Sequence, residues 1–153
     1  MLAMSVNPRR CGMATKVMEP GTGMTIAIAP KNEACYVPGR REFFKYRELG
    51  VTEATGGRMR AQVTSAEKGL SEATGWHYHV CDMQFVYVLS GWVDLDFEDG
   101  RSVRLQAGDS LMLPGGTRHQ ETRTSETFEI LEVSVPADMG TEKCDPPAGF
   151  VSR

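Results

Sequence analysis

The chain has 153 residues, of which 41% are hydrophobic and 24% charged, a composition ordinary for one soluble globular domain. Twenty acidic residues against 17 basic ones give a net charge of -3, which argues against nucleic acid as a partner, because a phosphate backbone needs clustered cations. The longest apolar run near the start, residues 26–29, is too short for a membrane span or a signal-peptide core. We therefore expect a cytoplasmic protein with no membrane or nucleic-acid partner.

The first forty residues differ from the rest. Five of the nine methionines lie in the first 24 positions among scattered glycine and proline, and no periodicity is sustained there. We predict an irregular N-terminal arm over residues 1–42, with Met24 as a second candidate start site. The stretch after Pro136 is rich in proline and predicts an irregular tail over residues 137–153. A single domain over residues 43–136 remains between them.

Short strands separated by turn signals fill this central region. Apolar side chains at 93, 95 and 97 alternate with acidic ones, and Asp99-Gly100 predicts a tight hairpin before a return strand at 103–105. Further strands are expected at 59–64, 85–89, 111–113 and 128–135, whereas 41–49 can form a helix or a strand. The sequence predicts an all-β domain, either a sandwich or a closed barrel.

Four cysteines are present, and none forms a Cys-x-x-Cys pair: Cys11, Cys35, Cys81 and Cys144. In a chain without a recognisable export signal they are predicted to be reduced thiols, with disulfide pairing as the alternative. Cys81 is interpreted as a small buried hydrophobic residue rather than a metal ligand.

All three histidines lie within 43 residues of one another. His77 and His79 form a His-x-His pair, and alternate residues of a strand face the same side, so both imidazoles are expected to point at one spot. His119 follows a Pro-x-Gly turn, after which a strand can return it to that spot. Converging nitrogen donors suit Fe, Mn, Ni, Cu or Zn. A surface pair without metal is the alternative interpretation of His-x-His alone.

The residues around the histidines follow two spacing patterns. In the first, four residues separate His79 from Gln84, and six separate Gln84 from Gly91. In the second, five residues separate Gly108 from Pro114, one separates Pro114 from Gly116, and two separate Gly116 from His119. This pair of motifs resembles the two signature motifs of the cupin superfamily, small β-barrels that hold a metal inside the barrel.

Three positions depart from the cupin motifs. Ser71 stands where the first motif begins with glycine, and Arg123 stands where the second ends with asparagine. Gln84 stands where the first motif has glutamate. A glutamine keeps an oxygen donor within reach but supplies no negative charge. A metal held with Gln84 is therefore expected to be a stronger Lewis acid, while the site loses a carboxylate that could act as a base.

The resemblance implies an all-β fold: one cupin-type β-barrel (double-stranded β-helix, jelly-roll-like) over residues 43–136 with an irregular N-terminal arm. It implies one divalent transition metal, Fe or Mn first, then Ni, Zn or Cu. The implied ligands are His77, His79 and His119, with Gln84 as a weaker fourth. A barrel that has lost its metal is the alternative.

Three other residues are candidates for the site. Arg60 and Gln62 share one face of a predicted strand and could bind a substrate carboxylate, although we prefer an outward orientation with Ala61 and Val63 inside. Glu129 shares a face with three apolar residues and is a candidate general base, although Phe128 and Ile130 compete for the inner face.

By resemblance, the expected function is that of a metal-dependent enzyme acting on a small metabolite that bears an enol, catechol or carboxylate oxygen. Two reaction types stay open, a dioxygenase and an O2-independent lyase or isomerase. The alternative is a non-catalytic barrel that binds or senses a small molecule. We also expect a homodimer formed by exchange of edge strands or N-terminal arms.

Overall fold

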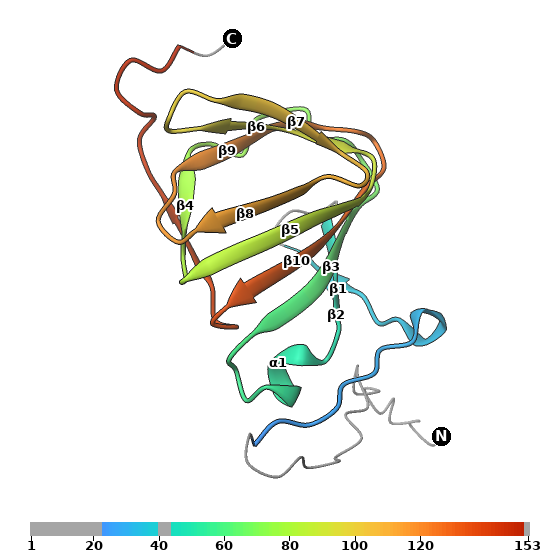
Figure 1. Cartoon of the computed structure of the whole chain (residues 1–153). Coiled ribbons are helices and arrows are strands. Elements are labelled where there is room, and N and C mark those ends of the chain that lie inside the picture. The colour runs from blue at the N-terminus through green and yellow to red at the C-terminus, as the bar shows by residue number, and fades with distance from the viewer. Residues whose placement is uncertain (1–22, 40–43, 152–153) are drawn as a thin grey trace, which may run out of the picture.

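The computed structural model describes residues 23–39 and 44–151. Within them the chain forms two antiparallel sheets that face each other (Figure 1). The first sheet has the order β1-β2-β3-β10-β5-β8, with bounds Val37–Pro38, Phe44–Glu48, Arg60–Ala66, Phe128–Val135, Met83–Ser90 and Ser110–Pro114. The second has the order β11-β4-β9-β6-β7, with bounds Gly140–Lys143, His77–Val80, His119–Thr124, Trp92–Phe97 and Ser102–Gln106.

The helical content is small. A 3-10 turn, η1, covers Lys31–Glu33, and one short helix, α1, covers Val51–Ala54. In the part of the chain that the structure describes, no helix has the length and apolar character needed to cross a bilayer. The all-β prediction is therefore confirmed.

The alternation read from the sequence corresponds to the observed strands. In β6 the side chains of Val93, Leu95 and Phe97 are buried between the sheets, while Asp94 bonds Arg104 across the hairpin on the other face. β6 pairs with β7 around the predicted turn, where Gly100 has a φ of 87°. The alternation of polar and apolar residues therefore predicted this hairpin correctly, because only one of its faces contacts the core.

One open alternative is settled and one expectation changes. Within residues 41–49, strand β2 covers Phe44–Glu48 and pairs with β3, so the strand alternative applies there. The tail predicted from residue 137 is not irregular throughout: β11 pairs with β4 and brings Thr141 opposite His79. The second sheet therefore extends beyond Pro136. The sequence did not predict this strand, because four residues are too few to show a detectable alternation. The proline and glycine residues around it also favoured an irregular segment.

The cysteine prediction is wrong for one residue. Cys35 is disulfide-bonded, whereas Cys81 and Cys144 are free thiols. Cys11 lies outside the described residues, as does most of the predicted arm. Sequence spacing does not report which cysteines are brought together in space, so a bridge could not be inferred from it.

The turn at Gly91 joins β5 to β6 and tolerates no side chain. Its φ is 74°, and a Cβ there would lie 2.2 Å from the backbone carbonyl of Thr127. We expect Gly91→Ala to lower the free energy of unfolding by more than ~3 kcal/mol, since backbone strain and a backbone clash add together. Urea denaturation followed by circular dichroism measures the loss.

Gly100→Ala is the matched control. Gly100 also has a positive φ, but a Cβ there would meet no atom within 4 Å. Only the strain remains, and the expected loss is about 1–2 kcal/mol. Equal losses in the two variants would contradict the argument from the clash.

Candidate metal centre

The three histidines meet inside the barrel. His77 and His79 are on one face of β4, and the register of β4 with β9 sets His77 directly opposite His119. The ligand atoms of all three lie within 4.8 Å of one another. The ring centroids are 4.5 Å apart for His77 and His119 and 5.0 Å apart for His79 and His119. Two separate stretches of chain thus supply three nitrogen donors to one point.

Each ring is held by a hydrogen bond at Nδ1. The Nδ1 atoms of His77 and His119 lie 2.8 and 2.9 Å from the carbonyl oxygens of Gly75 and Thr117, respectively. A carbonyl only accepts, so Nδ1 carries a proton in both rings, and the neutral form of each ring has its lone pair at Nε2. Nδ1 of His79 lies 3.0 Å from the Thr141 hydroxyl on β11. Such outer contacts fix the ring orientation in metal sites.

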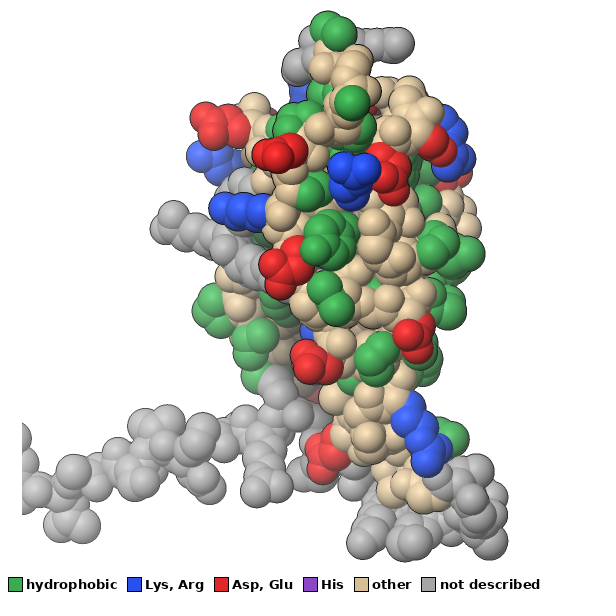
Figure 2. Space-filling view, turned by 90° about the vertical axis from the view of Figure 1, so that its left-hand side faces the viewer, with side chains coloured by type: hydrophobic (Ala, Val, Ile, Leu, Met, Phe, Trp, Pro, Cys, Tyr) green, Lys and Arg blue, Asp and Glu red, His purple; other side chains and the backbone are tan. Residues whose placement is uncertain are grey.

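His119 is 1% exposed. Burial lowers its pKa below the ordinary value, an effect only partly opposed by the neighbouring Glu121 carboxylate. A neutral imidazole with a free Nε2 is the form that binds a metal. The three residues therefore fit a divalent transition metal, for which imidazole is a suitable ligand. No histidine side chain is visible on the face of the molecule shown in Figure 2.

A carboxylate that the sequence analysis missed lies beside the rings. Glu121 Oε2 is 3.8 Å from Nε2 of His77, and Oε1 is 3.9 Å from Nε2 of His119. Burial raises the pKa of the Glu121 carboxyl, but His77, His119 and the Thr74 hydroxyl together lower it by more, so the net shift is downward. Strand alternation could have identified this residue, because Glu121 follows His119 by two residues on the same strand and so faces the same side.

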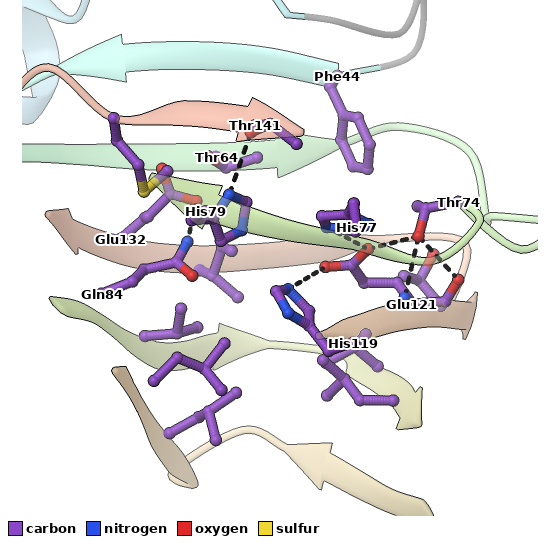
Figure 3. Close-up of a pocket in the computed structure, with 18 of the residues that line it drawn as sticks. Phe44, Thr64, Thr74, His77, His79, Gln84, His119, Glu121, Glu132 and Thr141 are labelled. Carbon is purple, nitrogen blue, oxygen red and sulfur yellow. Dashed lines mark hydrogen bonds and ion pairs between the residues drawn. The ribbon is translucent and has the colours of Figure 1, made fainter. Parts of the chain in front are cut away.

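The second missed carboxylate is Glu132, on the cavity-facing side of β10. It accepts hydrogen bonds from Gln84 Nε2 at 3.1 Å and Gln62 Nε2 at 3.0 Å, and Arg60 Nη2 lies 3.4 Å away. Figure 3 shows Glu132 and Gln84 on the His79 side of the site, apart from Glu121 and Thr74. Since Nε2 of Gln84 is committed to Glu132, its Oε1 is the atom left to bind a metal. Gln84 as a fourth ligand stays a prediction.

The histidines line one cavity of about 390 Å³ between the sheets. Apart from the polar groups already described, its wall is mainly apolar, with contributions from Leu70, Val86, Leu95, Leu111, Leu113 and Ile130. A space of this size and character suits a small metabolite with an apolar body.

Arg60 and Gln62 line this cavity, contrary to the outward orientation that we preferred. Ala61 and Val63 are buried as well, so both faces of β3 are covered. Polarity along β3 could not identify the inner face, because hydrophobic burial acts on both sides of the strand.

The inward orientation considered for Glu129 is wrong. Glu129 does share a face with Leu131, Val133 and Val135, but the cavity is lined by the opposite set, Phe128, Ile130 and Glu132. Glu129 instead accepts a hydrogen bond from Ser65 at 3.1 Å. The outer face of this strand is also apolar, and this misled the assignment of inside and outside.

Known proteins share this architecture. The family model described as "Cupin domain" matches residues 66–134. Protein SchB of Streptomyces halstedii is 32% identical to this chain over 128 residues, covering 75% of this chain and 89% of SchB. The chain belongs to the cupin superfamily. The matched segment contains His77, His79 and His119, and also the three positions that depart from the two motifs, Ser71, Gln84 and Arg123.

Solved cupin structures extend the comparison beyond the matched segment. The polyketide cyclase RemF from Streptomyces resistomycificus has a TM-score of 0.62 at 19% identity, with 84% of this chain and 88% of RemF covered. Salicylate 1,2-dioxygenase from Pseudoaminobacter salicylatoxidans in complex with gentisate has a TM-score of 0.55 at 13% identity, covering 69% of this chain and 30% of the dioxygenase. At these identities the likeness establishes the fold.

Proposed function

We propose that this cupin is a metal-dependent enzyme acting on a small oxygen-bearing metabolite with an apolar body. The observation that carries the proposal is the convergence of three imidazoles, two of them with Nδ1 bonded to a backbone carbonyl, on the wall of a mainly apolar cavity. A divalent ion held by His77, His79 and His119 would supply Lewis acidity toward a substrate carbonyl, enol or phenol oxygen.

We favour O2-independent proton-transfer chemistry of the lyase, isomerase or cyclase type. Glu132 is a carboxylate on the wall of the same cavity, so a substrate there lies within reach of a group that can accept or return a proton. The similarity to a protein named as a polyketide cyclase supports including polyketides among the candidate substrates.

Arg60 is our candidate for orienting the substrate. Its Nε atom is buried and has no hydrogen-bond partner among the described residues, while its Nη2 lies near Glu132. An unsatisfied buried donor costs free energy, and an oxygen of a bound ligand would relieve that cost. Gln62 donates to Glu132 and would act by holding that carboxylate in place.

Hydrogen–deuterium exchange tests the reaction type. We expect the metal-loaded protein to accelerate exchange of the acidic C–H protons of 1,3-diketones and of related polyketide fragments, followed by NMR, with no uptake on an oxygen electrode. The protein treated with chelator serves as the control. Stoichiometric O2 uptake with substrate conversion would instead identify a dioxygenase. Tight ligand binding without metal or turnover would identify a non-catalytic sensor.

We also propose a homodimer. On the outer face of the first sheet, neighbouring strands β5 and β8 expose a group of apolar side chains, Met83, Tyr87, Leu89 and Met112. Met112 is 54% exposed and lies opposite Phe85, so this apolar surface is continuous across the two strands. A second copy of the chain can cover it and the β8 edge together.

Light scattering on a sizing column tests the dimer. We expect dimer mass for the parent and monomer mass for Met112→Glu, because a buried charge there would oppose association. Gln106→Glu, at an exposed position on β7 of the second sheet, is a control for added charge. Monomer mass for the parent would refute the proposal.

A further inference from the structure

We propose that Glu121 is a ligand of the metal in this centre. In this arrangement β9 contributes both an imidazole, from His119, and the carboxylate that Gln84 does not provide. The inference rests on the metal site of the proposed function and adds a residue outside the two motif patterns to its coordination.

The distances allow Glu121 to share an ion with two of the histidines. Its Oε2 lies 3.8 Å from Nε2 of His77, and its Oε1 lies 3.9 Å from Nε2 of His119. Metal–nitrogen and metal–oxygen bonds of about 2.0–2.2 Å allow two ligand atoms on one ion to be separated by up to ~4.4 Å. Figure 3 shows the carboxylate between the two rings.

Glu121 is oriented as metal-binding carboxylates are. The Thr74 hydroxyl donates to Oε2 at 2.7 Å, and the Thr74 backbone N–H donates to the Glu121 carbonyl at 2.8 Å. The side chain is thus fixed from the loop before β4, and Oε1 retains its lone pairs for other partners. Hydrogen-bonded carboxylates of this kind are typical of metal ligands, whose outer contacts tune affinity.

Charge favours Glu121 over the other residues near the rings. Three neutral imidazoles and the neutral Gln84 amide leave the full charge of a divalent ion uncompensated, and a carboxylate ligand would halve it. Glu132 is the other carboxylate on the cavity wall, but its oxygens accept hydrogen bonds from Gln62 and Gln84. Glu121 is the carboxylate within 4 Å of two histidine Nε2 atoms.

Cobalt binding to the purified full-length protein tests the proposal. Co(II) affinity is measured by competition with a chromophoric chelator, and the visible absorption of the Co(II) protein reports its ligand set. We expect Glu121→Gln to weaken Co(II) binding at least thirtyfold and to shift the visible bands. Thr74→Val keeps the carboxylate but removes the hydroxyl that orients it, and a loss of roughly tenfold is expected.

Glu132→Gln is the matched control, because it removes the same charge from the same cavity at a carboxylate that accepts hydrogen bonds from Gln62 and Gln84. We expect a loss of no more than severalfold and unchanged bands. Equal losses of Co(II) affinity for Glu121→Gln and Glu132→Gln, with unchanged absorption bands, would overturn the proposal. Glu121 would then act on the metal only through its charge and not as a ligand. A parent protein that binds no Co(II) would overturn both this inference and the metal site, whereas a bound parent with an unaffected Glu121→Gln variant would overturn this inference alone.

Discussion

His119→Ala is expected to weaken the binding of a divalent metal by roughly a thousandfold or more, because it removes a proposed metal ligand rather than an outer contact. His119 is the most buried of the three histidines, and its Nδ1 is already bonded to Thr117, so its Nε2 is oriented before metal arrives. No other histidine can replace it, since the chain has three. Metal content of untagged protein after dialysis, together with titration calorimetry, measures the loss.

Thr117→Ala is the control for this change. The bond to His119 uses the backbone carbonyl of residue 117, which the substitution keeps. Metal affinity is therefore expected to stay within about twofold of the parent. If His119→Ala bound metal as the parent does while circular dichroism showed a native fold, the assigned coordination would be wrong.

Gln84→Glu is expected to destabilise the metal-free protein by about 2–4 kcal/mol at pH 7, since it replaces a donor to Glu132 with a second carboxylate. The Gln84 amide lies 3.1 Å from Glu132 Oε2, and its residue is 5% exposed, so solvent cannot screen the new repulsion. A divalent ion bound at this predicted ligand position would offset the repulsion, so added metal should stabilise this variant more than the parent. Denaturant unfolding with and without metal measures both effects.

Gln84→Met separates charge from packing. It removes the hydrogen bond to Glu132 without adding a carboxylate, so its loss is expected to be smaller, about 1–2 kcal/mol. The additional stabilisation by metal should be absent. If Gln84→Glu were as stable as the parent without metal, the pair of Gln84 and Glu132 would not explain why glutamine occupies this motif position.

Local patterns predicted the strands that have one apolar and one polar face. β6 and β7 were found because Val93, Leu95 and Phe97 enter the core while the acidic residues between them face outward. The same reasoning failed on β3 and β10, where both faces are apolar or covered. Parity still sorted the residues of β10 correctly into two sets, but it could not say which set lined the cavity.

Sequence patterns likewise predicted some residues of the site and missed others. Strand parity made His77 and His79 neighbours, and motif spacing added His119 and Gln84. The same alternation could have placed Glu121 beside His119, two residues earlier on the strand. It was not considered because a carboxylate on a strand is far more often solvated than buried. Thr141 had no signal, because its contact with His79 depends on a pairing between strands 62 residues apart.

Side-chain period and turn chemistry predicted an all-β fold, and motif spacing indicated a cupin with three converging histidines, since all of these are local properties of the chain. The folded structure was needed to show which faces of β3 and β10 point inward, that β11 completes the wall beside His79, and that Glu121 and Glu132 line the cavity with the histidines. These features depend on how two sheets and an edge strand pack together. Burial on both faces and contacts between distant residues leave no periodic trace along the chain.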